Sequence, residues 1–237
     1  MKKPLYVLLT ALMIIGLVAC GAPTATTTPS IVATEIPTVV EFADPVLEAM
    51  VRSAIGQPEG EITLTQARAV TRLDLNDELH RYLSQESKIT DINGLEAFTN
   101  LETLDLSTHA VSDISPLAGL TSLTALSLAG NPVADVSPLA GLTSLKLLIL
   151  SGSQAPDFSA LANLVNLQVL LLDNSTISDL TPLAGLSNLW QLHLANSSVE
   201  DLSILEPIYA NLTDKDFIIA TTLAELGFNL DENSRQA

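Results

Sequence analysis

The chain has few aromatic residues, few basic residues and a single cysteine. Aromatic residues make up 4% of its 237 positions, so the hydrophobic core must be built from aliphatic side chains, mainly leucine. One cysteine, Cys20, excludes an intrachain disulfide. Ten Lys and Arg against 27 Asp and Glu give a formal net charge of −17, which repels phosphate backbones and argues against nucleic acid binding.

The central part of the chain repeats itself with a fixed period. Segment 101–122 (LETLDLSTHAVSDISPLAGLTS) is followed by segment 123–144 (LTALSLAGNPVADVSPLAGLTS), and the register continues in blocks that begin at Leu145, Leu167 and Leu189. A fixed period with leucines at constant positions is typical of a leucine-rich repeat solenoid. We therefore predict an α/β solenoid, a horseshoe with a parallel concave β-sheet, short 3₁₀ or α turns on the convex side, and a helical cap at each end.

The N-terminus has the features of a bacterial export signal. Lys2 and Lys3 are followed by an apolar run over 5–19. The segment 17–20 (LVAC) resembles a lipobox, in which the thiol of Cys20 receives a diacylglyceryl group. We predict lipidation at Cys20 and a membrane-anchored protein that faces outside the cytoplasm. An ordinary cleaved signal and an uncleaved membrane span are the alternatives.

Composition and repeat register divide the chain into five segments. The second of them is rich in Thr and Pro and has too few apolar residues to bury a core face, so we expect a tether there. The segments are the lipoprotein signal peptide, 1–19; the lipidated Cys and tether, 20–41; the N-terminal cap, 42–69; six leucine-rich repeats, 70–210; and the C-terminal cap and tail, 211–237.

Each cap is predicted to contain a helix. The first covers 44–55, with Asp44 as its N-cap, Pro45 at the first helical position and Gly56 as its stop. The leucine register fails after the sixth repeat, because Asn211 occupies the next leucine position. We therefore predict a second helix over 213–226 that covers the last repeat.

Two repeats depart from the pattern. The first extends from Val70 to the leucine that opens the second, Leu101, and is longer than the period. Its additional residues lie within 76–88, and they form either a binding loop or a tolerated surface insertion. In the fourth repeat, Ala155 replaces Val or Ile, and Phe158 replaces a smaller aliphatic residue. We interpret this pair as an exchange of volume within the core.

An aspartate recurs at one position of each repeat. A single carboxylate per repeat is too few for calcium, which takes about 6–8 oxygen ligands, so we expect these side chains to accept hydrogen bonds from the turn backbone. His80, His109 and His193 are far apart in sequence, although His80 and His109 could approach each other and bind a metal. We predict no catalytic residues, no metal ligands and no cofactor. The aspartates are Asp91, Asp113, Asp135, Asp157, Asp179 and Asp201.

The repeat resembles that of a known family. From Leu123 to Leu142 the chain reads Leu-x-x-Leu-x-Leu-x-x-Asn-x-Val-x-Asp-Val-x-Pro-Leu-Ala-x-Leu, which resembles the internalin-type bacterial leucine-rich repeat. The resemblance covers roughly 44–209. It implies a surface protein that binds other proteins on its concave sheet and has no catalytic activity in this module.

The outward strand positions of repeats four and five carry large aliphatic side chains. Residues alternate in direction along a strand, so these side chains should lie together on the concave face. A contiguous exposed aliphatic patch is typical of an interaction site, and Trp190 could anchor a partner at its rim. The predicted partner-binding residues are Leu147, Ile149, Val169, Leu171, Asp173, Trp190, Gln191 and His193.

Together these features predict a monomeric, membrane-anchored, extracytoplasmic module that binds a protein or peptide and is not an enzyme. The alternative is a structural envelope protein that binds cell-wall glycan or neighbouring lipoproteins.

Overall fold

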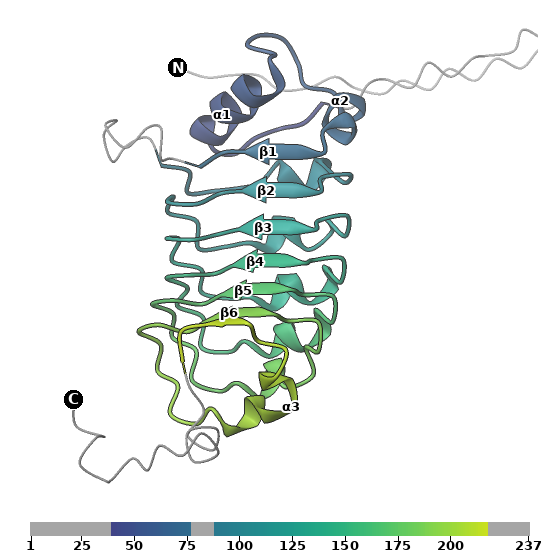
Figure 1. The fold of residues 1–237 in the computed structure, drawn as a ribbon. Helices are drawn as coiled ribbons and strands as arrows, with labels where there is room; N and C mark the ends of the chain where they lie inside the picture. The colour runs from purple at the N-terminus through teal and green to yellow at the C-terminus, as the bar shows by residue number, and fades with distance from the viewer. Residues whose placement is uncertain (1–38, 77–87, 218–237) are drawn as a thin grey trace, which may run out of the picture. The chain divides into compact units, whose positions relative to one another are not determined.

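The computed structural model describes residues 39–76 and 88–217, all within one compact unit, Pro37–Ala237 (Figure 1). Cys20, most of the predicted tether, His80 and most of the predicted insertion lie outside the described residues. The same holds for residues 218–237.

Seven short strands form one parallel sheet in chain order, β1 to β7 (Figure 1). From β2 to β6, paired residues are one repeat period apart in sequence, as in the pair Thr103 and Ala125. Between β1 and β2 the pairing spans a longer stretch of chain, from Arg72 to Thr103, as the long first repeat requires. The strands are Arg72–Asp74 (β1), Thr103–Asp105 (β2), Ala125–Ser127 (β3), Leu147–Ile149 (β4), Val169–Leu171 (β5), Gln191–His193 (β6) and Asp214–Lys215 (β7).

The central residue of each strand from β1 to β6 is a buried leucine. In β2, for example, Leu104 is 1% exposed, while Thr103 and Asp105 on either side of it are half-buried. Leucines from successive repeats build one continuous aliphatic core. Burial of each leucine stabilises the folded state by about 1.5–3 kcal/mol. One repeat alone buries too little to fold, whereas stacked repeats bury enough.

A column of 3₁₀ helices runs alongside the sheet, and each contacts the next from η3 to η7. Three of them begin with Ser-Pro or Thr-Pro, because proline fixes the backbone angle that the first helical position needs. The column confirms the predicted turns. Its members are η3 (Leu95–Ala97), η4 (Ser115–Leu117), η5 (Ser137–Gly141), η6 (Ser159–Asn163), η7 (Thr181–Leu183) and η8 (Ser203–Leu205).

The N-terminal cap contains helices α1 (Pro45–Ile55) and α2 (Leu64–Ala69). Helix α1 confirms the prediction: Asp44 accepts hydrogen bonds from Val46 N and Leu47 N, and Gly56 ends the helix with φ 69°. Val40, which we expected in the tether, is buried and donates its N–H to Ile62 O at 2.7 Å. None of the helices within 39–76 and 88–217 has the length and apolar character needed to cross a membrane.

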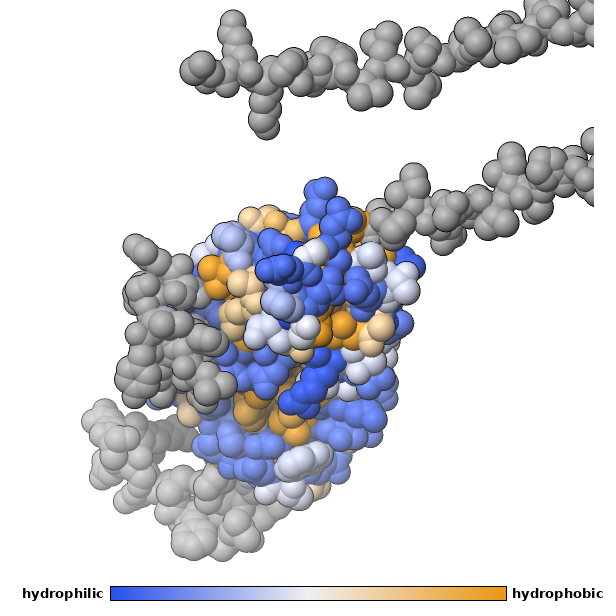
Figure 2. All heavy atoms as spheres, turned by 90° about the horizontal axis from the view of Figure 1, so that it is seen from above, coloured by the Kyte–Doolittle hydropathy of each residue, from blue (hydrophilic) through white to orange (hydrophobic). Residues whose placement is uncertain are grey.

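The cap gives the solenoid a mostly polar end. Figure 2 views the molecule from the cap side, where hydrophilic side chains cover most of the described surface and hydrophobic ones form small separate areas. Terminal repeats need such a cover because their apolar end would otherwise face water.

The C-terminal end corrects the sequence prediction. Residues 214 and 215, expected inside a helix over 213–226, form β7, and Asp214 pairs with Gln191; residues 218–226 lie outside the described part. The buried leucine of this seventh strand segment is Leu212, one position later than the repeat period requires. The chain gains this residue around the short helix α3 (Glu206–Tyr209), so the repeat register shifts rather than ends.

Asparagine side chains show the same shift. Asn188 donates its side-chain N–H to Val165 O, and Asn211 donates its own to Ser187 O at 3.0 Å. Asn211 therefore corresponds to Asn188 and not to the leucine after it. The dipeptide Asn-Leu, at 188–189 and again at 211–212, was the sequence signal for this seventh repeat.

Candidate functional site

The face of the sheet opposite the leucine core, here called the outer face, carries two rows of side chains. The parallel register aligns them without offset, so neighbours in a row belong to successive repeats. The first row is Arg72, Thr103, Ala125, Leu147, Val169 and Gln191, and the second is Asp74, Asp105, Ser127, Ile149, Leu171 and His193.

Four aliphatic side chains form a contiguous patch on this face, here called the aliphatic square. Leu147 pairs with Val169, and Ile149 pairs with Leu171. All four are half-buried, while Leu148 and Leu170 between them are fully buried in the core. The four side chains of the square therefore lie outside the core, and each is partly exposed to solvent.

The other predicted partner-binding residues lie at the C-terminal side of the aliphatic square. Gln191 and His193 pair with Val169 and Leu171 in the next strand. Trp190 precedes β6 and is 43% exposed, and its backbone N–H donates to Gln168 O. Asp173 follows the end of β5 and accepts a hydrogen bond from Ala195 N. The fold brings these residues to one region of the outer face.

A shallow hollow of about 420 Å³ extends from the aliphatic square toward the N-terminal end. Leu147 and Ile149 line one side of it, and Arg72 lines it at the first strand. Between Arg72 and the two aliphatic residues, the small side chains Ala125 and Ala129 of the third repeat leave space for the hollow. We did not predict these two alanines as part of the site. The small size of Ala125, which lies between Thr103 and Leu147 in its row, was the signal in the sequence.

Hydrogen bonds order the polar part of the hollow. Asp105 accepts hydrogen bonds from the backbone N–H and the hydroxyl of Ser107, at 2.9 and 2.5 Å. The Ser107 hydroxyl also lies 2.7 Å from the hydroxyl of Ser127 in the next repeat. The hollow thus has fixed acceptors at one side and aliphatic carbon at the other, a combination that suits an amphipathic peptide or protein segment.

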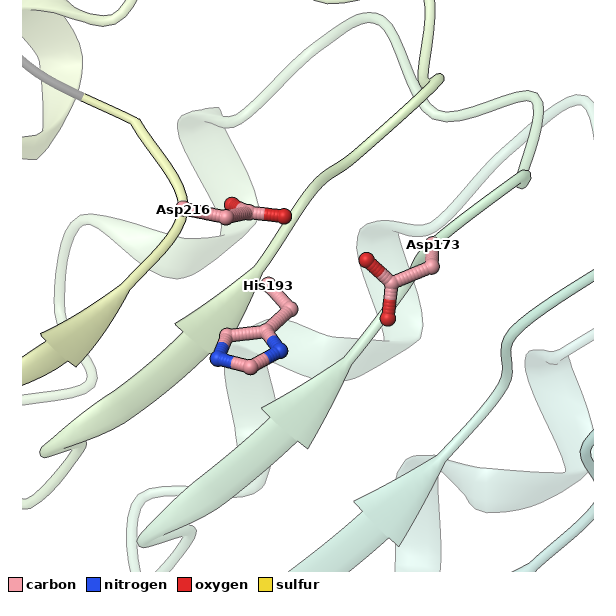
Figure 3. Close-up of side chains that lie close together, drawn as sticks. All are labelled: Asp173, His193 and Asp216. Carbon is pink, nitrogen blue, oxygen red and sulfur yellow. The ribbon is translucent and has the colours of Figure 1, made fainter.

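A second group of side chains gathers where β5, β6 and β7 end. Oxygens of Asp173 and Asp216 and a ring nitrogen of His193 all lie within 4.8 Å of one another (Figure 3). Asp216 accepts hydrogen bonds from Leu194 N and Ala195 N, the first at 2.9 Å. We predicted no metal ligands from the sequence, and this group was missed because Asp216 was expected inside a helix.

The recurring aspartates have the predicted structural role. Each accepts a hydrogen bond from the backbone N–H two positions later, as Asp113 does from Ser115 at 2.8 Å. Hydrogen bonds from the backbone and side chain of Ser115 lower the pKa of Asp113 below 3.8. Hydrogen bonds from the side chain and backbone of Thr181 and Ser203 likewise lower the pKa of Asp179 and of Asp201. These carboxylates order the turns.

His109 also has a structural role. It is 2% exposed, accepts a hydrogen bond from Ile89 N at its Nδ1, and donates from Nε2 to Leu75 O at 2.6 Å. Asn131 occupies the equivalent position one repeat later. Its Oδ1 accepts a hydrogen bond from Val111 N, and its Nδ2 donates one to Leu106 O. His80, which we considered as a metal-binding partner of His109, lies outside the described residues.

The parallel sheet, the column of 3₁₀ helices and the leucine core define a leucine-rich repeat solenoid with an internalin-like fold. Among solved structures, the chain is similar to an internalin, InlF, from Listeria monocytogenes, with 27% identity and a TM-score of 0.61 over 77% of this chain and 59% of that one. Internalin C2 from the same organism is 28% identical, with a TM-score of 0.52 over 77% of this chain and 97% of that one.

A leucine-rich repeat protein from Leptospira interrogans shares the fold at 19% identity, with a TM-score of 0.55 over 65% of this chain and 38% of that one. No protein-family model and no curated protein matches the chain.

Proposed function

We propose that the protein is a non-enzymatic binding module that holds a protein or peptide partner on its outer face, across the hollow and the aliphatic square. The observation that supports this most is the paired, half-exposed set of Leu147, Ile149, Val169 and Leu171 beside the hollow. Soluble proteins rarely leave such contiguous aliphatic surface unused. Solenoids of this class bind partners on the extended surface that their stacked strands create.

The aliphatic square supplies the desolvated centre of the proposed interface, and Trp190 supplies an aromatic side chain at its rim. Interfaces concentrate their binding energy in a few apolar and aromatic residues that polar groups surround. Arg72, Asp105 and Ser107 provide such groups at the hollow, and Gln191 provides one at the other side.

Charge substitution in the aliphatic square tests the proposal. The variants Leu147→Asp and Leu171→Asp should each weaken partner capture from an envelope extract by at least about 100-fold, because a carboxylate would be desolvated without a counter-charge. Both positions are half-exposed, so the melting temperature should stay close to that of the unchanged protein.

The matched control is Val165→Asp, on an exposed side chain outside the outer-face rows. Capture that survives both substitutions would contradict the proposed site. Capture by purified cell wall in place of a protein would favour the structural envelope role instead.

We further propose that Cys20 carries a lipid that anchors the module to the membrane, facing outside the cytoplasm. The lipobox-like segment 17–20 supports this, as does the Thr- and Pro-rich composition between it and the cap. Cells that express the protein should incorporate radiolabelled palmitate into it, and a Cys20→Ser variant should lose both the label and its membrane association. A labelled Cys20→Ser variant would contradict the anchor.

A further inference from the structure

Asp173, His193 and Asp216 come from three consecutive repeats and converge at the C-terminal side of the outer face. His193 ends β6, Asp173 follows the end of β5, and Asp216 follows β7. One potential ligand atom from each lies within 4.8 Å of the other two. In Figure 3 the two carboxylates point toward each other across the space beside the imidazole ring.

The orientation of His193 suits metal ligation. Its Nε2 lies 3.1 Å from Oδ1 of Asp214, and its other ring nitrogen is turned toward Asp173 (Figure 3). The Asp214 carboxylate can only accept this hydrogen bond, which favours a proton on Nε2, and in the neutral tautomer with that proton Nδ1 has a lone pair for a metal ion. A histidine that binds a metal usually donates its second N–H to a carboxylate in this way.

The two carboxylates are held in place by backbone groups and still have ligating capacity. Asp216 accepts hydrogen bonds from Leu194 N and Ala195 N, and Asp173 accepts one from Ala195 N. A carboxylate offers about four lone-pair positions, so each keeps at least one for a cation. Zinc–nitrogen and zinc–oxygen bonds of about 2.0–2.2 Å hold ligand atoms about 3–4 Å apart, which small rotations of these partly exposed side chains achieve.

We propose that Asp173, His193 and Asp216 form a binding site for one divalent transition-metal ion, of which zinc is the best match. One imidazole with two carboxylates suits zinc better than calcium, which prefers a larger set of oxygens. The excess of 27 acidic over 10 basic residues adds a favourable field for any cation. The ion would link β5, β6 and the segment after β7, and so fasten the last repeat to the sheet.

The site uses neither the aliphatic square nor the hollow, but it shares Asp173 and His193 with the predicted partner-binding residues, and His193 pairs with Leu171 of the square. Metal binding is therefore tested by a measurement that needs no partner, so that its failure can be distinguished from failure of the proposed partner binding.

Isothermal titration of the full chain in detergent with zinc chloride, after removal of metal by a chelator, tests the site. One zinc per chain should bind, and His193→Gln and Asp173→Asn should each weaken this binding by at least about tenfold. Asparagine retains an oxygen that can accept the Ala195 N–H, so Asp173→Asn should melt like the unchanged protein in the presence of chelator. Zinc should raise the melting temperature of the unchanged protein more than that of His193→Gln or Asp173→Asn.

His80→Gln, at a histidine outside the described residues, is the matched control and should bind zinc like the unchanged chain. Zinc that binds His193→Gln with unchanged stoichiometry and affinity would show an adventitious ion only and would overturn the proposal. Calcium binding tighter than zinc binding would overturn it equally.

Discussion

Phe158 and Ala155 both lie in the core of the fourth repeat, as the interpretation of an exchange of volume requires. Both are buried, with 5% and 0% of their surfaces exposed, at positions where other repeats carry Ile114 with Val111 or Val136 with Val133. A large and a small side chain therefore replace two of intermediate size. The core accepts such a swap because packing depends on total volume and shape more than on the identity of each residue.

Phe158→Ala should lower the free energy of unfolding by about 3–5 kcal/mol, because it removes a buried ring and leaves a cavity. Urea denaturation measures the loss. The double variant Ala155→Val with Phe158→Ile restores the side chains of the second repeat, Val111 and Ile114, and should be more stable than the sum of its single changes predicts. A loss below about 1 kcal/mol for Phe158→Ala would contradict the exchange.

Single residues were predictable where one repeat could be compared with the next. The aspartate row and the volume exchange were visible in this way, and hydrogen bonds such as that from Ser137 N to Asp135 confirm the former. His109 was harder to interpret, because its two bonds to Ile89 and Leu75 reach across repeat boundaries that a single repeat does not reveal.

The carboxylate of Asp44 links helix α1 to the first repeat, in addition to the core packing of Leu47 and Val51. Oδ1 of Asp44 accepts hydrogen bonds from the N-terminus of the helix, and Oδ2 accepts them from Thr90 N and Asp91 N in the first repeat. Burial by itself raises the pKa of Asp44, but the backbone N–H groups of Thr90, Val46, Asp91 and Leu47 outweigh it and lower that pKa below 3.8. The residue joins the cap to the repeats.

Asp44→Asn should lower the free energy of unfolding at pH 7 by about 1–3 kcal/mol, because an amide N–H₂ cannot accept the hydrogen bonds that Oδ2 receives. The folded-state pKa lies below the unfolded one, so this stability is present above the unfolded value and is lost as pH falls through the folded value. Urea denaturation at pH 7 and in acid should show the two proteins converging in acid.

The control for that comparison is Glu59→Gln, at an exposed position of the cap, which should change stability by less than about 0.5 kcal/mol. An Asp44→Asn variant whose stability equals that of the unchanged protein at pH 7 would contradict the linking role of the carboxylate.

At the level of strands and helices, the sequence predicted the regular elements well and the last one wrongly. Helix α1 has strong local end signals at Asp44 and Gly56, and β2 to β6 repeat one pattern. Strand β7 follows a single extra residue, and this shifts Leu212 out of a fixed period. A prediction from a fixed period fails at such a shift. In the folded chain, the short helix α3 accommodates the extra residue.

Over the whole molecule, the aliphatic square, the hollow and the Asp173–His193–Asp216 group all lie on the outer face or at its C-terminal side. The aliphatic square was predictable, because alternation along a strand and a known period together determine which side chains are neighbours. The hollow and the Asp173–His193–Asp216 group were not, because the first depends on the absence of side-chain volume and the second on the register of β7.

Photocrosslinking in living cells tests partner binding on the outer face. A photoreactive amino acid that replaces Leu171 should give one discrete crosslinked product containing a protein partner, and an added Leu147→Asp change should abolish it. The same amino acid in place of the exposed Gly119, which lies just after η4 in the column of 3₁₀ helices, should give no such product. A partner crosslinked from position 119 and not from position 171 would contradict binding on the outer face.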